Sequence, residues 1–269
     1  MNKTIGFLGA GNIGGAIISG VIKAGLVAPT QIIAADVNPQ RLGQLSEAYH
    51  IDTTHSNIEA AQQSDILFLS IKPFLYDSVI AEIRGHVKPD AIMVVVAAGY
   101  GISDVRQKFD NESIKIAKAM PNIPAMVNAA MTAVCTTDNM TETEIGDVLA
   151  IFNSVGQTEI LPEHLFDVFT AVAGSSPAYA FIFIDALADA GVKYGLTRPQ
   201  ALKFCTQVIL GVAKMIQETG EHPAALKDAV CTPGGTTIEA ICELDKLGFR
   251  NAIISCVDAC VSKSVRIRN

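Results

Sequence analysis

Short runs of almost continuously apolar residues recur along the first part of the chain, and between them apolar residues follow a helical spacing. Such runs are typical of strands that crossover helices cover on both faces, as in a parallel sheet. The runs Ile66–Ile71 and Ile92–Ala98 are the purest, so we expect them at the centre of the sheet. The pattern predicts strands near residues 4–8, 31–35, 65–70, 91–96, 114–119, 130–135 and 156–160.

After Pro162 the strand pattern stops, and the remaining chain divides into helices. Ser176 and Pro177 fit an N-cap and a first helical position, and Thr197 with Gln200 fits a capping box. Glycines stand where two of these helices would end. The boundaries predict helices over about 177–194, 198–218, 235–247 and 249–268, with a shorter helix after His222.

The first predicted strand runs into the segment Gly9-Ala-Gly11-Asn-Ile-Gly14, which a small-residue helix, a second strand and Asp36 follow. In this order each glycine has a role in dinucleotide binding. Gly9 allows a tight turn after the strand, Gly11 lets the backbone approach a pyrophosphate, and Gly14 lets helix and strand pack closely. The helix N-terminus favours an anion there. We therefore predict a Rossmann-type dinucleotide-binding domain, against the alternative of a glycine-rich turn without ligand. The motif residues predicted at the cofactor are Gly9, Ala10, Gly11, Asn12, Ile13 and Gly14.

Length and helix composition predict a second domain. The chain has 269 residues, which favours two cores over one. We expect an α/β fold with the Rossmann-type domain over residues 1–161, followed by an all-α dimerisation domain over residues 162–269. The helices of the second domain are rich in Ala, Gly and Ser and apolar over much of their circumference. This composition favours close packing between two copies of the chain, as a homodimer.

Charge and hydropathy argue against nucleic acid and membrane as partners. The net charge is −7 and no Lys/Arg run occurs, so we expect no basic surface for a phosphate backbone. The apolar run Ala91–Ala98 is too short to cross a bilayer. Residues 168–192 are long enough, but we expect them to form a buried helix. The residues that interrupt this run are Ser175, Ser176, Pro177, Asp185 and Asp189.

The N-terminus and the cysteines indicate a cytoplasmic protein without a metal site. No export signal precedes the first strand, and the six cysteines form no C-x-x-C pair, which favours reduced thiols. Asp185 and Asp189 lie one helical turn apart, but a solvated face or an interface explains that spacing better than a metal does. The five histidines neither cluster nor stand beside a credible nucleophile, so none is assigned to catalysis.

Loops at the carboxyl ends of the strands are where a dinucleotide lies in an open α/β sheet. Lys72 either reaches a ribose or phosphate or is an ordinary surface lysine. Ala97 and its small neighbours either admit a flat nicotinamide ring or pack tightly. Asn57 fits a contact to the adenine half of the cofactor or a helix cap. Asn122, which stands between two prolines, fits the rigid wall of a site.

The segment Cys231–Glu239 has the build of an anion clamp. Pro233 and the two glycines after it leave backbone N–H groups free where a helix begins, and two threonine hydroxyls stand in the first turn. This arrangement suits a small carboxylate. The alternative is an ordinary threonine-capped helix start.

These motifs also carry a resemblance. Glu221–Asp228 followed by Cys231–Glu239 resembles the signature of the pyrroline-5-carboxylate reductases, and Ala119–Pro124 and Gly174–Tyr179 are similar to that family in order and separation. The resemblance runs from end to end. It implies an NAD(P)H-dependent oxidoreductase acting on a CH–NH group, which reduces 1-pyrroline-5-carboxylate to L-proline with NADPH or NADH, the last step of proline biosynthesis. It also implies a dimer through the helical domain, and leaves a ring of dimers, a decamer, open.

The resemblance extends to single positions. We expect the backbone N–H groups at 234 to 236 to hold the substrate carboxylate, and Thr237, the predicted catalytic residue, to hydrogen-bond the ring nitrogen. The predicted substrate-binding residues are Gly234, Gly235, Thr236, Thr237 and Asn122. Beyond the glycine motif, the resemblance implies as cofactor-binding residues Asn57, Ser70, Ile71, Lys72, Pro73, Val96, Ala97 and Ala98. Asp36 is added to them because of its place at the end of the second strand.

One residue departs from the family pattern. The family commonly prefers NADPH, whereas the second strand here ends in Asp36, where a carboxylate favours an unphosphorylated ribose and repels a 2′-phosphate. Arg41 lies close enough in the sequence to offset that repulsion. NADH therefore stays open beside NADPH.

Two other functions remain as alternatives. A β-hydroxyacid dehydrogenase would share the two-part fold, but it needs a catalytic lysine on the first long helix of its second domain, where this chain has no lysine before Lys193. A non-catalytic dinucleotide sensor would bind NAD(P)H but would have no use for the clamp. Activity on homologous cyclic imines also stays open, because walls of glycine and threonine discriminate weakly against one methylene.

Overall fold

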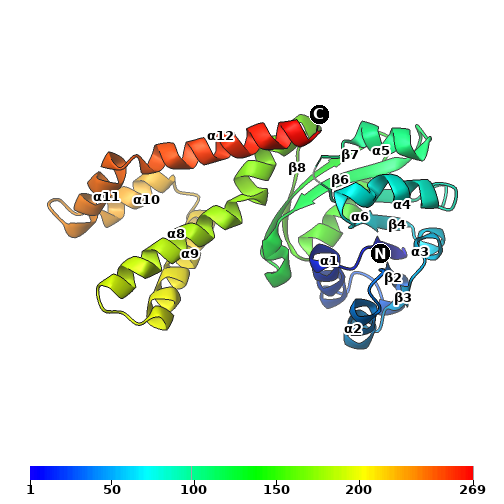
Figure 1. Ribbon diagram of the computed structural model, residues 1–269, viewed down its shortest axis with the longest axis horizontal. Coiled ribbons are helices and arrows are strands. Elements are labelled where there is room, and N and C mark those ends of the chain that lie inside the picture. Colours follow the sequence, from blue (N-terminus) through cyan, green and yellow to red (C-terminus); the bar gives the residue numbers. More distant parts are fainter. Residues whose placement is uncertain (98, 269) are drawn as a thin grey trace. The chain divides into compact units, whose positions relative to one another are not determined.

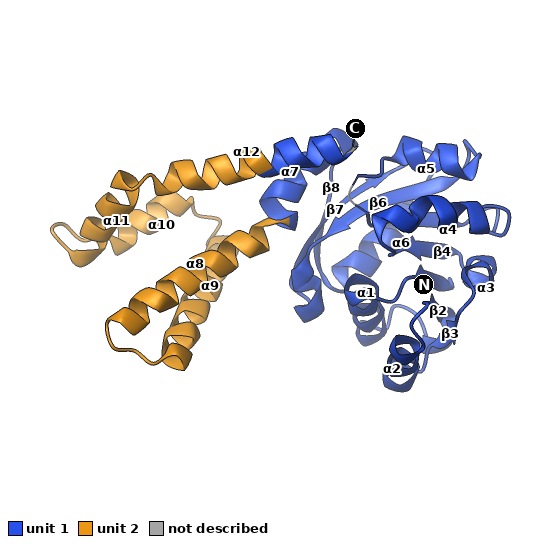
Figure 2. Cartoon of the chain, in the orientation of Figure 1, with its two compact units in different colours: residues 1–174, 260–269 blue, residues 175–259 orange. Residues whose placement is uncertain are grey.

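The computed structural model describes residues 1–97 and 99–268, which form two compact units (Figure 2). Unit 1 contains residues 1–174 and 260–269, and unit 2 contains residues 175–259. The predicted domain division lies earlier, after residue 161, and stays a prediction. Residues beyond it still pack on the sheet of unit 1, since Phe166 and Phe169 are buried against Ala133.

Unit 1 is built around an eight-stranded sheet with the order β3-β2-β1-β4-β5-β6-β7-β8 (Figure 1). All the predicted strands are present, and β3 was missed because its sequence, Asp-Thr-Thr, carries no apolar pattern. The strand bounds are β1 Ile5–Leu8, β2 Ile32–Ala35, β3 Asp52–Thr54, β4 Ile66–Leu69, β5 Ile92–Val95, β6 Lys115–Pro121, β7 Ala130–Thr136 and β8 Gly156–Ile160.

The strand pattern predicts a parallel sheet, but the sheet is not parallel throughout. Strands β1 to β6 pair in parallel, but β7 runs antiparallel to β6, and β8 runs parallel to β7. Between β6 and β7 lies only the 3-10 helix η3, Ile123–Val127. A connection that short returns the chain as a hairpin, because a parallel crossover needs about a dozen residues or more.

Helices cover both faces of the sheet. Against one face pack α1, α2 and α6, with stacked Phe7 and Phe68 rings at the centre of the core. Against the other pack α3, α4 and α5. The bounds are α1 Asn12–Lys23, α2 Pro39–Tyr49, α3 Asn57–Gln63, α4 Tyr76–Ile83, α5 Ile102–Phe109, α6 Glu142–Asn153 and α7 Phe166–Phe169, with short turns η1 Pro29–Gln31, η2 Pro73–Leu75, η4 Glu163–Leu165 and η5 Thr170–Gly174.

The helices of the second half lie close to their predicted bounds. They are α8 Ser176–Lys193, α9 Arg198–Thr219, α10 Pro223–Val230, α11 Thr236–Lys246 and α12 Phe249–Arg268, of which the last residues belong to unit 1. The predicted cap of α8 is wrong, because Ser175 holds that position in a helical conformation and Ser176 lies inside the helix. The reason is that η5 leads the chain into α8 already coiled.

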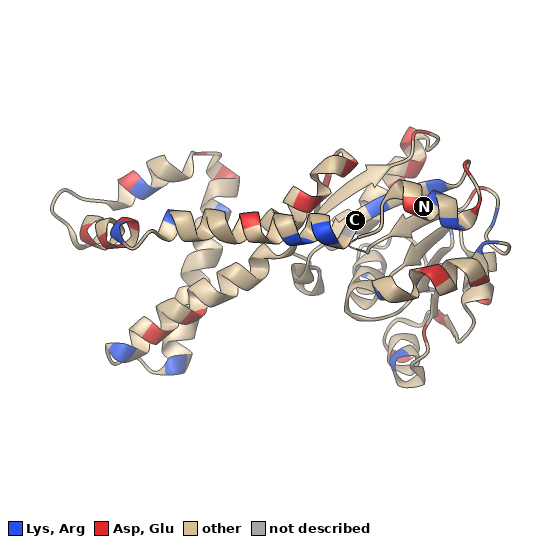
Figure 3. Ribbon diagram, turned by 45° about the horizontal axis from the view of Figure 1, so that its top comes forward, with Lys and Arg blue, Asp and Glu red and all other residues tan. Residues whose placement is uncertain are grey.

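Unit 2 buries little apolar surface within one copy of the chain. Its buried cluster consists of Ala188, Ala201 and Cys205, whereas Ile182 is 71% exposed. Figure 3 shows long helical stretches without Lys, Arg, Asp or Glu. The helical run Glu163–Lys193 is long and apolar enough to cross a membrane, with only 11% of its most apolar window buried. The expectation that this run is buried is therefore wrong for the single chain.

Candidate functional site

Strand register brings one set of predicted residues to the same edge of unit 1. Leu8 of β1 lies opposite Ala35 of β2 and Leu69 of β4, and Leu69 lies opposite Val95 of β5. The residues that follow these strand ends are Gly9, Asp36, Ser70 and Val96. The strand order reverses between β1 and β4, and a reversal of this kind opens a crevice at the carboxyl ends of the strands.

The glycine loop after β1 has the geometry that each glycine predicts. Gly9 has a φ of +90°, and a Cβ there would lie 2.6 Å from the carbonyl oxygen of Ser70. A Cβ on Gly14 would lie 2.6 Å from the carbonyl oxygen of Gly9. A Cβ on Gly11, by contrast, would meet no atom within 4 Å. The loop is therefore closed by its own backbone on one side and open at Gly11, where a phosphate would approach.

Helix α1 begins at Asn12 with Gly11 as its N-cap and with no acidic residue in its first turn. The first N–H groups of a helix have no acceptor within the helix, and they form its partially positive end. A glycine cap leaves these donors without a side-chain partner. Because Gly11 is exposed, the helix end fits an anionic pyrophosphate, and the chain needs no basic side chain to hold it.

Asp36 and Arg41 both form hydrogen bonds with the backbone of Ala10, and we call this arrangement the Ala10 clasp. Asp36 Oδ2 accepts a hydrogen bond from the Ala10 N–H at 2.7 Å, and its Oδ1 accepts one from the Asn38 N–H at 2.9 Å. Arg41 Nε donates to the Ala10 carbonyl at 2.6 Å, and Nη2 donates to the Gly11 carbonyl at 3.4 Å. Sequence reasoning missed these contacts, since nothing local to either residue signals them.

The other predicted cofactor residues differ in their burial and in their hydrogen bonds. Asn57 donates through Nδ2 to the Glu82 carboxylate at 2.9 Å, and Ser56 caps α3 by accepting from the Glu59 N–H at 3.2 Å. The remaining members follow β4 and β5. Lys72 and Pro73 are exposed, Ile71 and Val96 are half-buried, Ala97 is buried, and Ala98 lies outside the described residues. Their contact with a cofactor stays a prediction.

Asn122 is buried at the end of β6, and its amide is engaged by the backbone. Nδ2 donates to the Ala173 carbonyl at 2.9 Å, and Oδ1 accepts from the Met131 N–H at 3.1 Å. The side chain thus ties β6 to β7 and to η5. One amide hydrogen and one oxygen lone pair remain, so a contact with substrate stays a prediction beside this structural role.

In unit 2 the predicted clamp forms a tight turn before α11. Gly234 has a φ of +67°, which favours glycine, and the Gly235 N–H donates to the Thr232 carbonyl at 3.0 Å. A Cβ on Gly235 would lie 2.3 Å from Thr232 Oγ1. The Gly235 N–H therefore has an acceptor within the turn, and its contact with a substrate carboxylate stays a prediction.

The helix itself offers free donors two residues further along the chain. Helix α11 begins at Thr236 with Gly235 as its N-cap and without a side-chain cap. The N–H groups of Thr236, Thr237 and Ile238 therefore lack acceptors within the helix. Thr236 is exposed and Thr237 is half-buried. These groups can receive a small carboxylate, with the Thr237 hydroxyl beside it.

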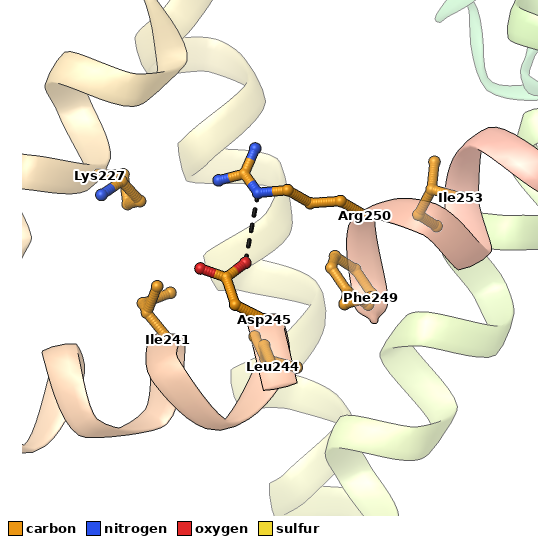
Figure 4. Close-up of a pocket in the computed structure, with 7 residues that line it drawn as sticks. All are labelled: Lys227, Ile241, Leu244, Asp245, Phe249, Arg250 and Ile253. Carbon is orange, nitrogen blue, oxygen red and sulfur yellow. Dashed lines mark hydrogen bonds and ion pairs between the residues drawn. The ribbon is translucent and has the colours of Figure 1, made fainter. Parts of the chain in front are cut away.

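A separate cavity of about 380 Å³ lies among α10, α11 and the start of α12 in unit 2. Figure 4 shows its walls, which are largely apolar apart from Lys227 and the Arg250–Asp245 pair, joined at 3.3 Å. The residues that line it among those described include no member of the clamp. No three His, Cys, Asp or Glu side chains within residues 1–97 and 99–268 lie close enough together to hold a metal ion.

Comparison with known proteins matches both halves of the chain. A family model described as pyrroline-5-carboxylate reductase dimerisation matches residues 163–267, and one described as NADP oxidoreductase, coenzyme F420-dependent, matches residues 4–99. The pyrroline-5-carboxylate reductase of Escherichia coli (strain K12) is 43% identical over 267 residues, which cover 99% of each chain. The chain belongs to the pyrroline-5-carboxylate reductase family.

Solved structures agree with this family. A pyrroline-5-carboxylate reductase from Coxiella burnetii superposes with a TM-score of 0.94 at 27% identity, over 100% of both chains. The Plasmodium falciparum pyrroline carboxylate reductase, solved with NADP bound, has a TM-score of 0.90 at 28% identity, over 100% of this chain and 99% of its own. The predicted family and the predicted two-part fold of the reductase are therefore confirmed.

Proposed function

We propose that the chain reduces 1-pyrroline-5-carboxylate to L-proline with NADPH or NADH, the last step of proline biosynthesis. The observation that carries this proposal is the match to a relative named for the reaction at 43% identity over 99% of both chains. Membership of the family also confirms the predicted class, an NAD(P)H-dependent oxidoreductase acting on a CH–NH group. The β-hydroxyacid dehydrogenase alternative is not favoured, since α8 has no lysine before its last residue, Lys193.

Unit 1 supplies the cofactor half of the reaction. The reduced nicotinamide provides a hydride to the imine carbon. The open space at Gly11 and the uncapped N–H groups at the start of α1 support binding of the pyrophosphate there. Ser70 reinforces the loop, because its hydroxyl donates to the Gly9 carbonyl at 2.6 Å. The Gly9 end of the loop is therefore held in place before a ligand arrives, which reduces the ordering cost of binding.

Unit 2 supplies the substrate half. The N–H groups of Thr236, Thr237 and Ile238 hold the carboxylate of the cyclic imine at the positive end of α11. The Thr237 hydroxyl hydrogen-bonds the ring nitrogen, which draws electrons from the C=N bond and makes its carbon a better hydride acceptor. The carbon gains the hydride, and the nitrogen gains a proton that comes from water. No bond to the protein forms.

The Ala10 clasp bears on the choice between the two cofactors. Asp36 places a carboxylate at the end of β2, where the ribose of the adenine half lies in this fold. Arg41 donates from Nε and Nη2 to two carbonyl groups of the loop, which leaves Nη1 and the positive charge to compensate part of the repulsion of a 2′-phosphate. We therefore expect the enzyme to accept both cofactors.

The helical half supports self-association. The dimerisation model covers residues 163–267, and the exposed apolar helices of unit 2 need a cover that one chain does not supply. A homodimer through these helices meets that need, and it accounts for the exposed run Glu163–Lys193 without a membrane. A ring of dimers, up to a decamer, and a cytoplasmic location complete the proposal.

The test is the loss of reduced-nicotinamide absorbance with 1-pyrroline-5-carboxylate, run in parallel with NADPH and NADH. Turnover with proline as the product supports the reaction, and the ratio of kcat/KM values reports the cofactor preference. Binding of either cofactor without turnover would contradict the proposal and return the chain to the class of dinucleotide sensors. The six-membered homologue of the substrate, assayed in the same way, measures how strictly the clamp selects ring size.

A further inference from the structure

Arg106 on α5 carries a buried donor without a partner. Its Nε is buried and has no hydrogen-bond acceptor among the described residues. No ion pair or hydrogen bond of the Arg106 side chain is found within this part of the chain, although its backbone carbonyl accepts from the Asn111 N–H at 3.5 Å. A charged donor that is left unsatisfied in a partly buried position is costly. An arginine in this state calls for an acceptor that a ligand would bring.

Arg106 lines a cavity of about 420 Å³ in unit 1, which we call the α5 cavity. Ser103 and Gln107 from the same helix and Thr136 from the end of β7 contribute neutral polar groups to its walls. The volume lies at the lower end of the range for small-molecule sites. The residues of the glycine loop take no part in it, so the cavity differs from the predicted cofactor crevice.

Three acidic residues also line the α5 cavity, namely Glu112, Asp138 and Glu163. Glu163 is already paired, because its Oε1 lies 3.1 Å from Lys118 Nζ and accepts from the Ile102 N–H at 2.9 Å. Glu112 and Asp138 are exposed, and neither has an ion pair with a described residue. The cavity therefore presents one unpaired cation and two unpaired carboxylates.

This charge pattern selects the kind of ligand. A phosphate would meet Arg106 but also the carboxylates, and a simple cation would leave Arg106 unpaired. A zwitterion satisfies both sets, because its carboxylate and its ammonium group are only a few ångströms apart. At the Glu163 end, burial and then the Glu163 carboxylate raise the pKa of the Cys135 thiol, although Lys118 opposes them.

We propose that the α5 cavity binds a free α-amino acid. The Arg106 guanidinium receives the ligand carboxylate, with the two parallel hydrogen bonds that arginine forms to this group. The ammonium group lies toward Asp138 and Glu112. Ser103 and Gln107 complete the polar contacts. The inference uses neither the clamp nor the glycine loop, so it stands or falls separately from the proposed reaction.

The first experiment is a thermal-shift screen of the wild-type protein against the common α-amino acids, followed by calorimetric titration of the strongest binder. L-Proline is left out, because the proposed product would also bind at the clamp. We expect Arg106→Met to weaken binding at least about tenfold, as loss of a charge-assisted hydrogen bond does. Arg84→Met removes an exposed arginine at the end of α4 and is expected to leave binding unchanged.

Further measurements separate a ligand site from a structural role. Arg106→Met is expected to unfold no earlier than the wild type, since an unpartnered donor is removed, and to keep the kcat/KM of the reductase assay. Asp138→Asn is expected to weaken amino-acid binding while leaving any acetate binding unchanged. The proposal is overturned if no amino acid of the panel binds, if acetate alone binds as tightly as the amino acid, or if Arg106→Met abolishes reductase activity.

Discussion

Each of the two units contains a helix that begins without a side-chain cap, but the residues around the two helix starts differ. Helix α1 in unit 1 and helix α11 in unit 2 both begin after a glycine N-cap without a side-chain cap, so both present free N–H groups to an anion. In unit 1 the chain itself builds the walls, through the Ala10 clasp and the Ser70 hydroxyl. In unit 2 a Cβ on Gly234 would meet no atom within 4 Å.

The difference between the two helix starts follows from how many buried residues support each of them. The loop before α1 rests on β1, whose four residues are all buried, whereas α11 has no buried residue among those described. One chain is thus enough to build the cofactor half. We infer that the substrate half depends on a second copy for its rigidity, and each prediction below tests one side of this comparison.

The largest effect is expected from Ile182→Glu on α8. The Ile182 side chain is 71% exposed in the single chain, and the proposed dimer buries it. A carboxylate buried there without a partner costs several kcal/mol, about 4 kcal/mol or a thousandfold in the dimer dissociation constant. Light scattering is expected to show monomers at concentrations where the wild type is dimeric. Gln217→Glu, which adds the same charge at an exposed polar position of α9, is the control; dissociation of both variants alike, or of neither, would contradict the proposed interface.

Thr237→Ala probes the clamp itself. Loss of the hydroxyl beside the ring nitrogen is expected to lower kcat by about ten- to a hundredfold, toward the range measured for single transition-state donors. Cofactor affinity, measured by fluorescence titration, is expected to change little, because Thr237 lies in unit 2. Thr237→Ser restores the hydroxyl and is expected to recover most of the rate. Equal rates for Thr237→Ala and the wild type would remove the hydroxyl from the mechanism.

Gly14→Ala tests the self-built walls of unit 1. Its Cβ would stand 2.6 Å from the Gly9 carbonyl oxygen, so the backbone of the loop has to move. Overpacking of this kind costs about 1–3 kcal/mol, and we expect cofactor affinity to fall about ten- to a hundredfold. Gly43→Ala on α2, where a Cβ meets no atom within 4 Å, is the matched control. If Gly14→Ala binds NADH normally, the close helix contact is not required.

Asp36→Ser addresses cofactor choice within the Ala10 clasp. Removing the carboxylate relieves repulsion of a 2′-phosphate and is expected to raise the NADPH to NADH ratio of kcat/KM about tenfold. Affinity for both cofactors is expected to fall somewhat, since the Ala10 N–H loses its acceptor. Asp52→Ser on the exposed start of β3 serves as the comparison. An unchanged ratio would mean that Asp36 acts only as a support for the loop.

The smallest effect concerns ion pairs. Burial acts to raise the pKa of Glu144, but hydrogen bonds from Lys115 and Thr141 outweigh it and hold this pKa below its usual value. A carboxyl whose pKa is lowered on folding contributes stability above its unfolded pKa, and loses it as the pH falls through the folded pKa. We expect the Tm of Glu144→Gln to fall less steeply than that of the wild type as the pH is lowered. The corresponding difference in the free energy of unfolding is about 1 kcal/mol or less. In unit 2, Glu243→Gln breaks an exposed pair and should leave the profile unchanged; equal slopes in the two variants would show that burial does not matter here.

Local signals explain why so much of unit 1 could be predicted. Apolar runs mark β4 and β5 because both are covered on two faces, and the glycine spacing marks the loop because close backbone approach leaves no alternative residue. The prediction of secondary structure failed where contacts with residues outside the element determine its conformation. Strand β3 is held by pairing with β2 alone, and Ser175 is helical because η5 precedes it.

Contacts between distant residues lay beyond the sequence. Nothing near Asp36 or Arg41 in the chain indicates that both hold Ala10, and nothing near Arg106 indicates a donor without an acceptor. The bond of the Gly235 N–H to the Thr232 carbonyl within the clamp was likewise not predicted. Such details depend on hydrogen bonds whose partners only the folded backbone brings within reach.

The sequence by itself determined the family, the two-part fold, the strands of the central sheet apart from β3, and the two glycine-capped helix starts. These properties depend on residue type and spacing along the chain, which fix strand burial, turn geometry and helix caps locally. Tertiary structure decided the direction of β7, the partners of Asp36 and Arg41, the N–H groups left free at α11, and the unpaired guanidinium in the α5 cavity. Each of these depends on which backbone and side-chain groups meet across the sheet, and sequence spacing does not encode that distance.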